Sequence, residues 1–385
     1  MSRFVQTLVA VAVLLLLQFL ITFEMNVIMP LAPIVAQLYG VAENQVTYLN
    51  LGYALSGLFA PFLGFLADRF GIKRMLIVST LLFGLGTWLV SMQSSILFYV
   101  MGRTILGIGF YTLISISLSY FALLVSERKL GLMSGLYKFA FALAVFVSPL
   151  LGTWLVTTIS FSVIYRFLSI SALVLSILLC LAPSVKSESQ HMTLKEGMSL
   201  FKDKVAINMM SATALLSIPS IFFFNFLSIY LFQQKMTPIV IGQLYSVIAI
   251  GSMIAAVLIM FVSDRIGKVN VMYTGLAMSV IFFASFSIQI IPLYFALGLM
   301  LGIGFDLIWG LLYPLGTRMY PAQSATFLTM LSLIMSMTNV ISNAIGPWMF
   351  SLGGFQLLTM ICSLGALLAF FLIKKSIHST NLRNF

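Results

Sequence analysis

Charged side chains are scarce in this sequence. Asp, Glu, Lys and Arg together make up 8% of the 385 residues, whereas hydrophobic residues make up 61% and the mean hydropathy is +1.12. A soluble domain needs far more polar surface than this, so the soluble classes of protein are excluded. In lipid only helices and closed barrels satisfy all backbone N–H and C=O groups. The apolar runs extend for about 20 to 28 residues without strand-like alternation, which indicates membrane-spanning helices.

Cysteine and histidine are nearly absent. Cys180 and Cys362 lie in separate apolar runs, and His191 and His378 lie far apart in polar stretches without neighbouring ligands. A disulfide framework and a metal site are therefore not expected. The sequence contains no phosphate-binding loop and no nucleophile paired with a base, so we expect neither enzymatic activity nor a cofactor. No nucleic-acid motif accompanies the net charge of +11.

The apolar runs fall into two halves of six runs each. The first run begins at Phe4 and is too long for a cleaved signal peptide, so we expect it to stay as a helix. The sequence thus predicts an all-α integral membrane protein with twelve transmembrane helices in two six-helix bundles, 1–182 and 205–385, joined by a cytoplasmic linker at 183–204. The predicted helices span residues 5–33, 45–67, 75–93, 96–121, 131–156, 162–182, 205–232, 239–263, 270–288, 291–316, 322–350 and 354–374.

The basic residues orient the predicted helices. If the N-terminus is cytoplasmic, 16 of the 20 Lys and Arg residues fall in cytoplasmic segments and only Lys235 falls in an external loop. This bias predicts that both termini are cytoplasmic, and it explains the net charge without an acidic partner. The short loops and the lack of a targeting segment favour a bacterial cytoplasmic membrane, with the lipid bilayer as the protein's surroundings.

Three short patterns recur between the halves at nearly equal spacing. Asp68-Arg-Phe-Gly71 and Asp264-Arg-Ile-Gly267 are 196 residues apart, Gly107-Ile-Gly109-Phe and Gly302-Ile-Gly304-Phe are 195 apart, and Pro149 and Pro347 are 198 apart. An even number of helices in each half gives both halves the same orientation, so they form a parallel repeat related by a pseudo-two-fold axis. That arrangement is typical of transporters that rock around a site between the halves.

The segment after the second predicted helix resembles motif A of the major facilitator superfamily. It reads Gly64-Phe-Leu-Ala-Asp68-Arg69-Phe-Gly71-Ile-Lys73-Arg74, and a weaker copy contains Asp264, Arg265 and Gly267. The resemblance covers nearly the whole chain and implies the fold of that superfamily, in its twelve-helix drug or sugar and proton antiporter branch. It also implies that this loop is a gate that binds helix ends in one conformation and releases them in another. The alternative is a tight turn at Gly71 whose cations only fix the topology.

Two further patterns resemble family motifs in the membrane. Arg103-Thr-Ile-Leu-Gly107 resembles motif B, whose arginine is implicated in proton coupling, and Ser148-Pro149-Leu-Leu-Gly152 resembles a degraded antiporter motif. The resemblance implies a hinge at Ser148, Pro149 and Gly152 in the fifth helix. The matching position in the eleventh helix is Gly346-Pro347.

Only four charged residues lie well inside apolar runs, namely Glu24, Arg103, Lys138 and Asp306. Each costs roughly 2.5 to 3.5 kcal/mol near a helix centre, so we expect them to face a cavity or to pair. Glu24 is our candidate proton carrier, with Arg103 as the residue that assists proton coupling. The alternative is a fixed structural ion pair.

The predicted substrate cavity contains Asn26, Lys138, Asn225, Asp306, Trp309 and Tyr313. If Lys138 and Arg103 are free, the cavity suits an anionic or zwitterionic substrate. If Glu24 neutralises Arg103, aromatic side chains including Phe222, Phe223, Phe224 and Tyr230 leave an apolar cavity for lipophilic molecules. Such aromatics also serve as packing residues.

We therefore expect a monomeric, proton-coupled efflux transporter for a small organic or lipophilic molecule, working by alternating access with protons as the coupling ion. One alternative is a dedicated carrier or uniporter for a single organic anion, lipid or metabolite. A more distant alternative is a membrane sensor or scaffold that transports nothing.

Overall fold

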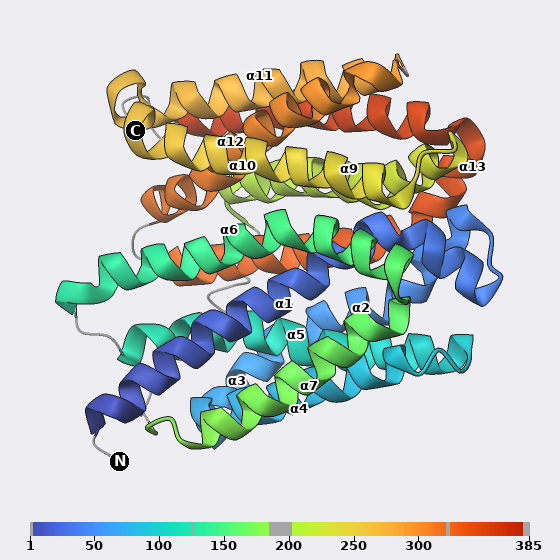
Figure 1. Ribbon diagram of the computed structural model, residues 1–385. Coiled ribbons are helices and arrows are strands. Elements are labelled where there is room, and N and C mark those ends of the chain that lie inside the picture. Colours follow the sequence, from blue (N-terminus) through green and yellow to red (C-terminus); the bar gives the residue numbers. More distant parts are fainter. Residues whose placement is uncertain (1–2, 125–126, 185–201, 289, 321–323, 380–385) are drawn as a thin grey trace. The chain divides into compact units, whose positions relative to one another are not determined.

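A computed structural model describes residues 3–124, 127–184, 202–288, 290–320 and 324–379. Within these ranges every regular element is an α-helix or a 3-10 helix (Figure 1). The chain divides into two units, unit 1 at Met1–Gln190 and unit 2 at His191–Phe385. In the described residues ten helices are long and apolar enough to cross a membrane. The protein therefore has the multi-span helical architecture expected from its composition, while the count of twelve and the linker at 183–204 stay predictions.

Unit 1 begins with a helix of 37 residues and contains one interrupted span. Its elements are α1 (Arg3–Tyr39), η1 (Glu43–Asn50), α2 (Leu51–Ser56), η2 (Gly57–Phe59), α3 (Ala60–Phe70), α4 (Ile72–Ser91), α5 (Ile96–Leu124), α6 (Glu127–Thr158) and α7 (Phe161–Cys180). Within the unit, α4 packs against both α5 and α7, and α1 packs mainly against α6.

The prediction of one continuous helix over 45–67 is wrong. Four short segments, η1 to α3, replace it. Where η2 ends and α3 begins, the N–H of Ala60 bonds to the carbonyl of Gly57, which is a 3-10 interaction. The next residue, Pro61, has no N–H to continue the α-helical pattern. The first break lies between η1 and α2. It follows the polar sequence that begins at Glu43, which has a low helix propensity and is poorly suited to lipid.

The described elements of unit 2 are five α-helices and one 3-10 helix. They are α9 (Lys204–Gln233), α10 (Pro238–Ile266), α11 (Lys268–Phe286), η3 (Ile291–Leu293), α12 (Tyr294–Met319) and α13 (Ser324–Ser379). Gly353 and Gly354 depart from helical geometry within α13, with φ of −149° and 61°. This break separates the predicted helices 322–350 and 354–374, although the second continues to Ser379 and residues 321–323 lie outside the described ranges.

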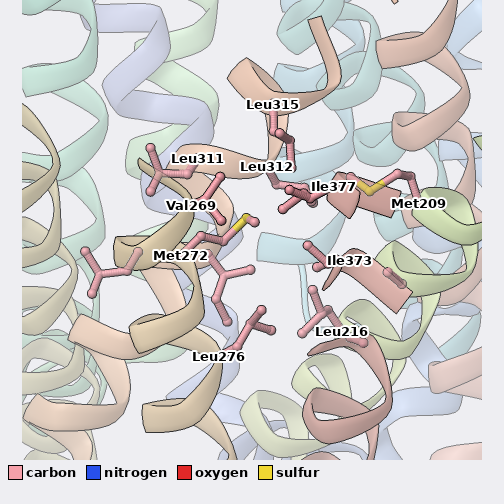
Figure 2. Close-up of a cluster of buried hydrophobic side chains, with 14 of the residues drawn as sticks. Met209, Leu216, Val269, Met272, Leu276, Leu311, Leu312, Leu315, Ile373 and Ile377 are labelled. Atoms are coloured by element: carbon pink, nitrogen blue, oxygen red, sulfur yellow. The ribbon is translucent and has the colours of Figure 1, made fainter. Parts of the chain in front are cut away.

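The core of unit 2 forms where α9, α11, α12 and α13 meet (Figure 2). Met272 and Leu276, like Ile373 and Ile377, are four residues apart and therefore lie on one face of their helices. Large apolar side chains also cover the outside, since Met260 is 68% exposed and Ile170 of unit 1 is 64% exposed. Apolar surfaces on both sides of a helix are suited to lipid as the solvent.

The repeated Gly-Ile-Gly pattern marks the same close approach of helices in both units. A Cβ added to Gly107 would lie 2.9 Å from the backbone of Tyr53 in α2, and one on Gly302 would lie 2.1 Å from the Ile248 oxygen in α10. The second glycine of each pattern meets the next helix, because Gly109 lies against Phe83 of α4 and Gly304 lies against Met278 of α11. Small residues are typical where transmembrane helices touch.

The repeated Asp-Arg-x-Gly pattern forms the same turn twice. Gly71 has φ 93° and ψ 131°, and Gly267 has φ 91° and ψ 129°. Each glycine N–H bonds at 2.9 Å to the carbonyl four residues earlier, in Ala67 and Ser263. Positive φ favours glycine, so the predicted special conformation at Gly71 is confirmed.

We expect Gly302→Ala to destabilise the protein, because the added methyl group meets the Ile248 backbone and forces α12 away from α10. Overpacking of this kind costs about 1–3 kcal/mol. Thermal unfolding of purified protein in detergent measures the loss. The control is Gly310→Ala on the same helix, whose Cβ meets only the end of the Ile259 side chain. Equal melting temperatures for both variants would contradict the packing argument.

Candidate functional site

Glu24 and Arg103 form a buried ion pair in unit 1. Glu24 lies on α1 and is 0% exposed, and Arg103 lies on α5 and is 2% exposed. The guanidinium Nη1 donates to Glu24 Oε1. The pair neutralises two charges that would otherwise each be costly in an apolar interior. Of the two arrangements that the sequence leaves open, the structure therefore contains the one in which Glu24 neutralises Arg103.

Three more side chains complete the surroundings of the pair. Arg103 Nε donates to Asn50 Oδ1 at 2.8 Å, and the guanidinium carbon lies 4.5 Å from the centre of the Tyr53 ring. On the other side, the Tyr165 hydroxyl donates to Glu24 Oε1 at 3.3 Å. The site thus gathers residues from α1, η1, α2, α5 and α7 of a single unit.

The two carboxylate oxygens of Glu24 have different surroundings. Oε1 accepts from Arg103 and Tyr165, whereas Oε2 is buried and accepts no hydrogen bond from the described part of the chain. A buried carboxylate oxygen without a donor costs free energy in an apolar interior. The two oxygens of Glu24 are therefore unequally compensated.

The structure places the motif A cation Lys73 at a helix end. Its Nζ donates to the Cys180 carbonyl at 2.8 Å and also to the Ala182 carbonyl, at the C-terminal end of α7. Cations stabilise the free carbonyls and the negative dipole at such an end. Arg69 and Arg74 are exposed, as is Arg265 in the second copy. The side chains of Asp68 and Asp264, and the surroundings of Gly64, lie outside the described residues.

Two tyrosines bind the described ends of the predicted linker at 183–204. Tyr120 of α5 donates its hydroxyl to the Pro183 carbonyl in unit 1. In unit 2, Tyr320 donates to Asp203 Oδ2, while Asp203 Oδ1 accepts the Val205 N–H at 3.1 Å and caps α9. Burial, and then the bond to Asp203, raise the pKa of the Tyr320 phenol. Each described end of the predicted linker is thus bound to its own unit.

The predicted hinge residues lie within helices and at close contacts. Ser148 and Pro149 are buried in α6, and a Cβ on Gly152 would lie 2.1 Å from Cγ2 of Val27. In α13, a Cβ on Gly346 would lie 2.7 Å from the Phe226 ring, and Pro347 beside it is buried. These contacts give the small residues a packing function, and hinge bending stays a prediction.

The predicted cavity residues of unit 1 do not join the ion pair. The Asn26 side chain donates to the Thr22 carbonyl of its own helix at 2.8 Å. Lys138 is exposed on α6.

The predicted cavity residues of unit 2 are half-buried and have separate neighbours. Asn225 donates to Asn343 Oδ1 at 3.4 Å, and Tyr313 donates to the Met335 sulfur at 3.0 Å. Asp306 lies beside Ser252 of α10. The Trp309 ring packs edge-on against Phe305 at 5.9 Å.

Several aromatic residues considered for the cavity are packing residues instead. Phe223 is 0% exposed and its ring lies 4.9–5.6 Å from those of Phe224, Phe283, Phe286 and Phe355. The Tyr230 ring stacks on Phe355 at 4.8 Å. Their edge-to-face and stacked arrangements are those favoured in aromatic cores.

Sequence reasoning missed Asn50, Tyr53, Tyr165 and Asn343. Each is a common polar or aromatic residue in an apolar run, and nothing in its immediate sequence indicates a charged partner. Asn50 and Tyr53 are three residues apart, a spacing at which two helical side chains can share a partner. This spacing becomes informative only when it is known that η1 and α2 pack on α5.

Comparison with curated proteins finds transporters. The multidrug resistance protein MdtG of Escherichia coli is 24% identical over 294 residues, which cover 71% of each chain. A multidrug resistance protein B homolog of Mycobacterium tuberculosis is 29% identical over 119 residues, which cover 31% of this chain and only 22% of that protein.

Solved structures and family comparison agree on the fold. The D-xylose–proton symporter superposes with a TM-score of 0.76 at 16% identity, covering 97% of this chain and 98% of that one. The human organic anion transporter MFSD10 superposes with a TM-score of 0.70 at 17% identity, covering 95% and 99%. Residues 14–253, more than half of the 385, match the Major Facilitator Superfamily. This chain therefore belongs to the Major Facilitator Superfamily of transporters.

Proposed function

We propose that this protein exports a small organic or lipophilic molecule across the bacterial cytoplasmic membrane in exchange for protons. The observation that carries the proposal is the buried pair of Glu24 and Arg103, with Glu24 Oε2 free of donors in the described chain. Protons are the coupling ion, no other cofactor takes part, and a monomer suffices.

Only one member of the pair is able to change its charge. The guanidinium of Arg103 stays protonated at every accessible pH, whereas the Glu24 carboxylate becomes neutral when it binds one proton. Proton binding therefore removes the ionic attraction between α1 and α5. A change in the water content around the site then shifts the balance between the two states, which links proton movement to a conformational change.

The substrate class rests on the relatives and on the neutralised cation. Relatives from two bacteria have names that refer to multidrug resistance. Because Glu24 neutralises Arg103, an anionic substrate has one cation fewer to bind in unit 1. A lipophilic or weakly polar molecule is therefore favoured over a single dedicated organic anion.

The motif A loop is our proposed gate. Its turn at Gly71 and the bonds of Lys73 to the end of α7 form a set of contacts that a moving helix breaks and remakes. In this proposal both termini are cytoplasmic, so the gate lies at the cytoplasmic side.

We expect Glu24→Gln to abolish proton movement while substrate binding persists, because the amide keeps the shape of the carboxyl group but binds no proton near neutral pH. Purified protein in liposomes with an internal pH-sensitive dye measures proton flux when lipophilic cations or organic anions are added. Substrate binding is measured separately by tryptophan fluorescence.

Each outcome decides between the candidate functions. Substrate-driven proton flux in the wild type that is lost in Glu24→Gln supports antiport. Transport without proton flux in both proteins rejects it and favours a uniporter or a dedicated carrier. Arg166→Gln, which changes an exposed residue of α7, is the matched control and should transport like the wild type.

We expect Arg103→Met to destabilise the protein, because the buried Glu24 carboxylate then loses its cationic partner. Removing one partner of a buried ion pair costs about 3–5 kcal/mol. Thermal unfolding of purified protein in detergent measures the loss. Arg166→Met is the control for loss of an arginine, because Arg166 is exposed on α7. Equal melting temperatures for the two variants would show that the ion pair does not contribute to stability.

A further inference from the structure

Arg103 needs partners that do not depend on the charge of Glu24. Its side chain is 2% exposed, and a buried guanidinium without a partner costs several kcal/mol. When Glu24 binds a proton, Arg103 loses its anionic partner but keeps its own charge. If no other group held it, this cost would keep Glu24 ionised and prevent proton uptake.

Two neutral groups hold the guanidinium away from Glu24. Asn50 Oδ1 accepts from Nε at 2.8 Å, and the face of the Tyr53 ring lies 4.5 Å from the guanidinium carbon. An amide oxygen and an aromatic face both stabilise a cation without adding a charge. Both contacts use parts of Arg103 other than Nη1, which donates to Glu24.

The break in the second predicted span places Asn50 against Arg103. Asn50 lies where η1 ends and α2 begins, with φ −97° and ψ 1°, and its side chain makes no bond to cap α2. It bonds to Arg103 instead. An asparagine at a helix N-cap normally accepts hydrogen bonds from backbone N–H groups of the first turn. The Asn50 side chain binds Arg103 and does not cap α2.

Close packing keeps α2 at a fixed distance from α5. A Cβ on Gly52 would lie 2.0 Å from the Thr104 hydroxyl oxygen, and Ser56 donates to both the Gly52 and Thr104 carbonyls. Gly52 and Ser56 flank Tyr53, and Thr104 follows Arg103 directly. Asn50 and Tyr53 are therefore held beside the guanidinium by the packing and hydrogen bonds of neighbouring residues, which do not involve the ion pair.

We propose that Asn50 is a positioning residue which, together with the Tyr53 ring, holds Arg103 in place when Glu24 is protonated and thereby sets the pH at which Glu24 takes up its proton. The inference rests on the proposed role of Glu24 in proton coupling. Removing either neutral partner raises the free energy of the state with protonated Glu24 more than that of the ionised state. In the protonated state no carboxylate compensates the charge of Arg103. Proton uptake then requires a lower pH.

Several other titratable groups surround Glu24, and of these only Tyr53 is changed in the test described below. In the described residues, the charges of Glu24 and Arg103 interact with the phenols of Tyr53 from α2, Tyr99 from α5 and Tyr165 from α7. Tyr53 also interacts with Tyr111. The Tyr53 hydroxyl is buried and has no partner in the described chain, so its ring face is the part that contacts Arg103.

The test is an infrared titration of the purified protein in detergent, which needs neither substrate nor transport. Protonated carboxyl groups give a C=O stretching band in the infrared spectrum. The band that is present in the wild type and absent in Glu24→Gln belongs to Glu24, and its intensity is measured as a function of pH. In Asn50→Leu and Tyr53→Leu we expect the midpoint to move to lower pH by about one unit. Tyr53→Phe keeps the ring face and should restore the wild-type midpoint.

The matched control is Asn44→Leu, which removes an amide from the same 3-10 helix at its other end. It should titrate like the wild type. Wild-type midpoints in folded Asn50→Leu and Tyr53→Leu would overturn the proposal, as would a Glu24 band that does not titrate in any variant. If the shifts occur but liposomes show no proton flux, the positioning role stands and the antiporter assignment fails.

Discussion

The structure of unit 1 depends on one constraint, the burial of a guanidinium that cannot lose its charge. Arg103 is nearly inaccessible to solvent, and a charge in an apolar interior is costly unless neighbouring groups compensate it. Four elements besides its own helix supply the surrounding groups: Glu24 from α1, Asn50 from η1, Tyr53 from α2 and, through Glu24, Tyr165 from α7. The cation thus determines which helices must stay close together.

The two units share their packing but not this charge. The glycine contacts and the positive-φ turns repeat at offsets of 195 and 196 residues. At the same offset of 195, the position of Arg103 corresponds to Gly298, which packs against Leu244, and that of Asn50 corresponds to Tyr245, which donates to the Phe224 carbonyl at 2.5 Å. The repeat therefore preserves helix spacing, while the positions that match Arg103 and Asn50 carry no charge in unit 2.

Much of the fold could be predicted because hydropathy and glycine spacing are local signals. Most of the long helices, the turn at Gly71 and the two charges of the site follow from apolar runs and from residues that are costly or unusual in lipid. The 3-10 segments and the Asn50 contact could not be predicted, since they depend on which helix lies opposite. The motif A resemblance implies that the loop binds helix ends, but it does not identify the end of α7 as the partner of Lys73, because backbone carbonyls have no sequence signal of their own.

The interrupted span connects the ionic site to the motif A loop. Asn50, which contacts Arg103, lies at its first break, and Gly71 and Lys73 follow its last segment. A continuous helix would move as one rod, whereas 3-10 segments have poorer hydrogen-bond geometry and adjust at lower cost. In the proposed mechanism Glu24 changes the charge balance at one end of this segmented path, and Lys73 binds α7 carbonyls at the other end, so the path links the proposed proton site to the loop.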